Sequence, residues 1–152
     1  MGAAYFYHLT RRPLEVALTE LLNAARSKDM RVAVRGPDLA RLSWLDEKLW
    51  LSPEDGFLPH GMAGGDHDAD QPILLTTGPA TNAATCVMSV DGADVAAEEA
   101  GVLDRVCVLF DGNDADALNV ARGQWKALTG AGVAAQYWSE ESGRWEKKAE
   151  SS

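Results

Sequence analysis

The spacing of apolar residues predicts a chain in which strands and helices alternate. Short, nearly continuous apolar runs are typical of buried strands, whereas leucines and alanines that recur every three or four residues are typical of amphipathic helices. The runs predicted as strands are 5–9, 31–34, 73–76, 85–90, 106–110 and 133–138. The predicted helices follow Pro13, begin near Gly36, and cover residues 94–100 and 115–131.

This alternation predicts an open, mostly parallel sheet with helices on both faces. The fold class is therefore α/β, as a three-layer α/β/α single domain over residues 1–152 with Rossmann-like topology. A chain of 152 residues can bury a core of its own without disulfides or metals. The charged segment 146–152 is expected to be a frayed, flexible tail.

The charge of the chain limits the partners that it can bind. Lys and Arg number 14 against 23 acidic residues, and a net charge of −9 disfavours a direct nucleic-acid binder. Cys86 and Cys107 lie in apolar runs, as reduced and buried cysteines do. Residues 1–9 lack the pattern of a secretory signal, and the long uncharged run 71–90 is broken by prolines and a glycine. We therefore expect a soluble, cytoplasmic protein without a membrane partner.

Motif searches give no support for a cofactor or a catalytic nucleophile. The glycine-rich nucleotide fingerprints and the Gly-x-Ser-x-Gly elbow are both absent from the sequence. Asp111 and Asn113 superficially resemble the start of a phosphotransferase site, but a turn with Asn113 or Asp114 as a helix cap explains them better. A small-ligand or nucleotide-binding enzyme with a site near Asp111 stays open as the alternative function.

An acidic segment begins like a calcium-binding loop. Asp66, Asp68 and Asp70 stand at the first, third and fifth positions of such a loop. Gln71 then occupies the position that needs glycine, and Thr77 the position that needs a bidentate glutamate. We therefore expect no metal site and no cofactor.

A basic and aromatic triplet lies in the last predicted helix. Arg122, Trp125 and Lys126 follow one another at helical spacing within residues 117–139, a segment that contains no acidic residue. Two interpretations fit this pattern. One is a solvated helix flank with a single exposed tryptophan, and the other is a docking surface for an acidic ligand with an apolar end.

A second cluster of aromatic residues follows the second predicted helix. Trp50 ends that helix, and Phe57, Pro59 and His60 stand in a segment, 52–71, that is rich in proline and glycine. Large aromatic residues in a long loop are typical of interface anchors, although they can also cover a core.

Both clusters carry a family resemblance. The first motif consists of Leu45, Asp46, Leu49, Trp50, Phe57, Pro59, His60, Ala63 and Gly64, and the second of Ala121, Arg122, Trp125, Lys126 and Ala127. In this spacing the residues resemble the bacterial DNA polymerase III chi subunit family (HolC family), whose aromatic first strand residues 5–7 also match. The resemblance implies a non-catalytic accessory subunit of the clamp-loader complex of a DNA-directed DNA polymerase, acting in DNA replication and contacting DNA only indirectly.

The resemblance also implies two binding sites. One would receive the acidic C-terminal tail of single-stranded DNA-binding protein, with Arg122 on the terminal carboxylate, Trp125 against the terminal ring and Lys126 near the preceding acids. Leu118 stands where the family can show a basic residue, and Trp125 replaces a tyrosine. The other site would dock the psi subunit or a clamp-loader subunit, and the residues that match its pattern are Trp50, Phe57, Pro59 and His60.

Overall fold

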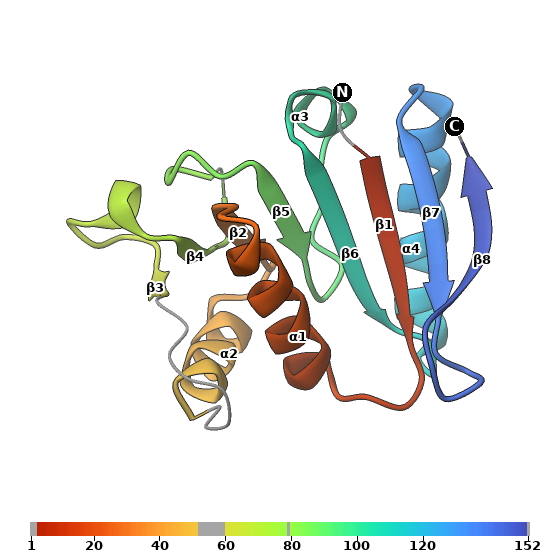
Figure 1. Ribbon diagram of the computed structural model, residues 1–152, viewed down its shortest axis with the longest axis horizontal. Coiled ribbons are helices and arrows are strands. Elements are labelled where there is room, and N and C mark those ends of the chain that lie inside the picture. Colours follow the sequence, from red (N-terminus) through yellow and green to blue (C-terminus); the bar gives the residue numbers. More distant parts are fainter. Residues whose placement is uncertain (1–2, 52–59, 79, 152) are drawn as a thin grey trace.

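The computed structural model describes residues 3–51, 60–78 and 80–151 (Figure 1). Its strands are β1 (Ala3–Leu9), β2 (Val32–Arg35), β3 (Gly61–Met62), β4 (Ile73–Thr76), β5 (Cys86–Ser89), β6 (Arg105–Asp111), β7 (Ala134–Ser139) and β8 (Glu146–Ser151). Its helices are α1 (Leu14–Ser27), α2 (Leu39–Leu51), α3 (Ala97–Val102), α4 (Ala115–Gly130) and a short 3-10 helix (Asp68–Asp70). None of the helices in these ranges is long and apolar enough to cross a membrane.

The strands form an 8-stranded sheet in the order β3-β4-β2-β5-β6-β1-β7-β8. In the described ranges every pair of neighbouring strands is parallel except β7 and β8. The N-terminal strand β1 therefore lies inside the sheet, between β6 and β7 (Figure 1). This arrangement confirms the predicted α/β fold with an open, mostly parallel sheet.

Helices cover both faces of the sheet. On one face, Leu18 and Leu22 of α1 and Leu42 and Leu45 of α2 are fully buried in a single core cluster. On the other face, Ala100 of α3 joins a second cluster to which α4 also contributes. Burial on both faces explains why strands such as β5 and β6 are almost continuously apolar.

The position of α3 depends on a buried arginine. Arg35, at the end of β2, is 8% exposed and donates to both carboxylate oxygens of Glu99 at 2.6 Å. The same guanidinium donates to the carbonyl of Asp94 at 3.3 Å. The helix begins at Ala97, after the predicted start at residue 94, because Ala96 is still extended, with ψ at 149°.

The end of the chain differs from the frayed tail that its charge predicts. Glu146–Ser151 forms β8, which pairs antiparallel with β7 along the edge of the sheet. The strand has no apolar alternation, and its backbone hydrogen bonds with β7 hold it in place. Its ion pairs are exposed and add little, the Lys147 and Glu150 side chains being 42% and 51% accessible.

Both cysteines are buried and free, as the sequence predicts. They lie on the neighbouring strands β5 and β6. A side-chain hydrogen bond between them lowers the pKa of the Cys86 thiol and raises that of Cys107. Because both side chains are buried, the two cysteines contribute to the packing between these strands.

Candidate functional site

Helix α4 carries the basic residues predicted to bind a peptide. Asp114 caps its first turn by accepting from the backbone N–H groups of Asp116 and Ala117, which confirms one of the two predicted caps. The inward stripe of the helix consists of Leu118, Ala121, Trp125 and Leu128. This stripe packs on β6, β1 and β7 and fixes the orientation of the whole helix.

Trp125 belongs to this inward stripe. Its ring packs edge-on against Phe6 at 5.3 Å and against Tyr137 at 6.1 Å between ring centroids. The side chain is half-buried, so part of its surface still faces solvent. Trp125 therefore covers the core, and it is not the isolated exposed tryptophan of the solvated-flank interpretation.

Arg122 and Lys126 lie beside the stripe, on exposed positions of α4. In the part of the chain that the structure describes, neither side chain forms a hydrogen bond or an ion pair. Their charges are therefore available to a ligand. The structure brings the predicted triplet together on one helix, with two free cations flanking a half-buried indole.

An open groove of about 680 Å³ lies beside Arg122. The groove is shallow, and its lining comes from α4, from the end of β1 and the residues after it, and from the residues that follow β6 and β7. The groove is lined by His8, Thr10, Arg11, Gly112, Asn113, Leu118, Arg122 and Glu141. It therefore combines cations with a small apolar surface.

His8, which lines this groove, is held by Tyr137 on the neighbouring strand β7. His8 Nδ1 and the Tyr137 hydroxyl form a hydrogen bond of 2.7 Å, and the two rings meet edge to face. Burial raises the pKa of Tyr137, although the charge of nearby Arg122 opposes the rise. Arg122 and His8 both line the groove.

Three lining residues, Arg11, His8 and Glu141, were not predicted from the sequence as members of this groove. Each follows or ends a parallel strand, and the carboxyl ends of such strands meet at one edge of the sheet. Their positions at strand ends could therefore be seen in the sequence. Predicting that they share one groove also requires the order of the strands in the sheet. That order places β1 beside both β6 and β7, which lie more than 90 residues further along the chain.

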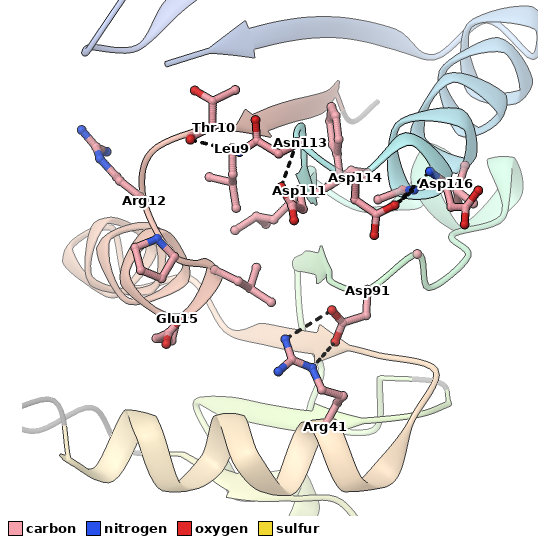
Figure 2. Close-up of a pocket in the computed structure, with 18 of the residues that line it drawn as sticks. Leu9, Thr10, Arg12, Glu15, Arg41, Asp91, Asp111, Asn113, Asp114 and Asp116 are labelled. Carbon is pink, nitrogen blue, oxygen red and sulfur yellow. Dashed lines mark hydrogen bonds and ion pairs between the residues drawn. The ribbon is translucent and has the colours of Figure 1, made fainter. Parts of the chain in front are cut away.

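A second cavity, also of about 680 Å³, lies at the carboxyl ends of β1 and β6, near Asp111 (Figure 2). Asp111 accepts from the backbone N–H of Asn113 at 2.9 Å, so the predicted turn is present. On the opposite side, Arg41 of α2 is paired with Asp91 at 3.2 Å (Figure 2).

The charges of this cavity do not suit a nucleotide. Five carboxylates line it against three arginines, and two of those arginines, Arg12 and Arg41, are already paired with carboxylates. The acidic excess, which includes Asp111, repels phosphates. At the N-terminus of α4, the Asp114 carboxylate already accepts from two of the backbone N–H groups. These features argue against the alternative function of a nucleotide-binding enzyme at Asp111.

The acidic segment around Asp68 forms a compact turn. Asp68 accepts from the backbone N–H groups of Gly64 and Gly65 at 2.9 and 3.0 Å, which explains its place in the loop. Across the described ranges, no group of three or more His, Cys, Asp or Glu residues is arranged to hold a metal ion.

The second predicted docking cluster is described only in part. Phe57 and Pro59 lie outside the described residues, and for Trp50 only its place in α2 is described. His60 is 5% exposed, and its Nε2 lies 3.2 Å from a carboxylate oxygen of Asp46. His60 is thus attached to α2 and contributes little surface of its own.

The exposed side of α2 nevertheless offers an aromatic and basic surface. Trp44 is half-buried on this helix. The guanidinium of Arg41 lies 4.4 Å and the ammonium of Lys48 lies 5.4 Å from the centre of its ring. Cations stacked on an indole form a surface of the kind that often contacts proteins.

Comparison with known proteins agrees with the resemblance seen in the motifs. A search among curated proteins finds no match for this chain. The family model described as "DNA polymerase III chi subunit, HolC" matches residues 1–136, which include α2, the groove-lining end of β1 and the whole of α4. The chain therefore belongs to the DNA polymerase III chi subunit family.

Proposed function

We propose that this accessory subunit of DNA polymerase III is a non-catalytic adaptor, which binds the acidic C-terminal tail of single-stranded DNA-binding protein on α4. The observation that carries the proposal is the exposed Arg122, which has no hydrogen bond or ion pair among the described residues and lies in a groove beside Leu118. A guanidinium fork without an acidic partner is suited to a peptide's terminal carboxylate.

The surroundings of Arg122 fit a peptide that ends in an apolar residue. Trp125 offers a partly exposed ring whose position is fixed by Phe6 and Tyr137. Such a rigid wall loses little conformational entropy when a ligand side chain packs against it. Lys126 adds a second positive charge one turn from Arg122, which favours the acidic residues that precede the end.

The surface of α2 is the proposed contact with the replicase. Arg41 and the exposed Lys48 stack there on the half-buried ring of Trp44, and Trp50 stands in the same helix. The partner would be a psi subunit or a clamp-loader subunit. An adaptor with separate sites for the tail and for the replicase raises the local concentration of each near the other.

The test is a titration of the protein with a labelled tail peptide. We expect Arg122→Ala to weaken binding at least about tenfold, because each charge-assisted contact contributes on the order of 1.5–3 kcal/mol. The matched control is Lys28→Ala, which removes one exposed cation at the far end of α1 and should leave binding unchanged. Absence of binding by the unaltered protein at low salt contradicts the proposal.

A chemical control tests recognition of the terminal carboxylate. The same peptide ending in an amide should bind about as weakly to the unaltered protein as the free acid binds to Arg122→Ala. The two changes should also not add, because each removes one partner of the same contact. Equal binding of acid and amide would show that Arg122 does not hold the carboxylate.

A further inference from the structure

Two arginines from distant parts of the chain face the same groove. Arg122 lies on α4, whereas Arg11 lies in the connection between β1 and α1. Leu118 and His8 also line the groove. The groove thus combines two cations, one carboxylate at Glu141 and less polar groups.

The connection that carries Arg11 is anchored by a buried carboxylate. Glu140 is 1% exposed, and its Oε2 accepts from the backbone N–H groups of Thr10, Arg11 and Arg12, each at 3.0 Å. This anchor fixes the backbone of Arg11 beside the groove. A preorganised cation loses less freedom on binding than one on a loose loop.

The guanidinium of Arg11 keeps most of its binding capacity. Its only hydrogen-bond acceptor in the described ranges is the carbonyl oxygen of Glu141, at 3.1 Å from Nη2. Arg12 differs, because it is paired with the carboxylates of Glu20 and Glu140. Arg11 is therefore exposed, positioned and without a carboxylate partner among the described residues.

We propose that Arg11, which lines the same groove as Arg122, is a second anion-binding residue for an acidic, carboxylate-ended peptide. Arg122 takes the terminal carboxylate, Arg11 takes a preceding acidic side chain, and Leu118 contacts the apolar residue. This assignment rests on the proposed function of the α4 surface. Arg11 would supply a positive charge from the β1–α1 connection to a groove in which α4 contributes the uncharged Leu118.

Glu141 provides a test of opposite sign. Glu141 lines the same groove, and its side chain forms no hydrogen bond or ion pair within the residues that the structure describes. A carboxylate at this place repels an acidic peptide. Replacing it by the neutral amide should therefore strengthen binding while leaving Arg11 and its carbonyl acceptor in place.

The experiment is a fluorescence-anisotropy titration at low and at moderate salt. The probe is a labelled synthetic peptide in which aspartates precede a C-terminal phenylalanine. The proteins are the full chain without substitution and its variants Arg122→Ala, Arg11→Ala, Arg11→Lys, Glu141→Gln and Lys28→Ala. We expect Arg11→Ala to weaken binding about fivefold, Arg11→Lys less, and Glu141→Gln to tighten binding about twofold. Lys28→Ala should bind as the full chain does.

The outcomes separate this inference from the proposed function. If the full chain binds and Arg122→Ala does not, but Arg11→Ala and Glu141→Gln both bind as the full chain does, Arg11 plays no part and the inference is overturned. If the full chain itself does not bind, the proposed function fails with it. Thermal melting of each variant identifies loss of folding, and Glu141→Gln tests the groove with Arg11 intact.

Discussion

The imidazole of His8 occupies the space that a Cβ atom on Gly112 would fill. The two residues meet because β1 and β6 run parallel and in register, with Leu9 beside Asp111, and the N–H of Gly112 donates to the carbonyl of Leu9 at 2.7 Å. His8 is held from its other side by the Tyr137 hydroxyl. The position of His8 in the groove that it lines with Arg122 therefore depends on the absence of a side chain at position 112.

Gly112→Ala should destabilise the protein by about 1–3 kcal/mol, because the ring of His8 must move and lose its bond to Tyr137. Peptide binding should weaken as well, because His8, which lines the groove, is displaced. Urea unfolding and the peptide titration measure the two effects. The matched control is Gly123→Ala, where a Cβ atom meets nothing within 4 Å. In the interior of α4 that change should stabilise by about 0.5–1 kcal/mol.

Glu140→Gln should change how stability depends on pH. Burial raises the pKa of Glu140, but the hydrogen bonds from the backbone N–H groups of Arg12, Arg11 and Thr10 outweigh it, so the pKa is lowered. A lowered pKa in the folded state gives stability that is present above the unfolded value, about 4.3, and is lost as pH falls through the folded value.

We therefore expect Glu140→Gln to be less stable by about 2–4 kcal/mol at pH 7 and to lose less stability on acidification than the unaltered protein. Urea unfolding at pH 7 and near pH 3 measures both quantities. The neighbouring Glu141→Gln removes an exposed carboxylate and serves as the control. A constant difference between Glu140→Gln and the unaltered protein at both pH values would contradict the bonded, ionised carboxylate.

Trp125→Ala should cost about 2–3 kcal/mol of stability, because a large ring is removed from its contacts with Phe6 and Tyr137. Trp125→Phe should cost less, since it keeps an aromatic ring in the stripe. Lys126→Ala, one residue further on and exposed, should change stability by no more than about 0.5 kcal/mol. Urea unfolding of the three variants measures this order, and an equal loss for Trp125→Ala and Lys126→Ala would contradict the half-buried position.

Ending the chain after Trp145 should expose the edge of β7, because β8 would be removed. The shortened protein should still fold, since no residue of β8 belongs to either core cluster. Its free edge should promote self-association that increases with concentration. Sedimentation velocity of both proteins measures this, and equal association of the two would show that β8 does not protect the edge.

The fold could largely be predicted from the sequence. Strands such as β6 are covered on both faces, so burial leaves an unbroken apolar run that is easy to recognise. Strand β8 could not be predicted, because a strand held by backbone bonds at an edge needs no apolar pattern. The start of α3 was likewise predicted too early, because Ala96 is extended and the carbonyl of Asp94 accepts from Arg35, about 60 residues away in the chain.

Only those residues of the candidate site that lie on α4 could be predicted from the sequence. Helical spacing groups Arg122, Trp125 and Lys126, but it does not show that Trp125 belongs to the buried stripe and its two neighbours do not. Arg11 and Glu141 join the groove through the sheet order. Contacts of this kind connect residues more than 100 positions apart, and local periodicity carries no information about them.

The place of β1 inside the sheet also has a consequence for synthesis on the ribosome. Synthesis of β1 precedes that of its partners β6 and β7, which are complete only at Asp111 and Ser139. The hydrogen-bonding groups of β1 therefore stay without these partners until then, and such non-local pairing slows folding. The groove that Arg11 and Arg122 line cannot form before α4 and Glu141 have been synthesised.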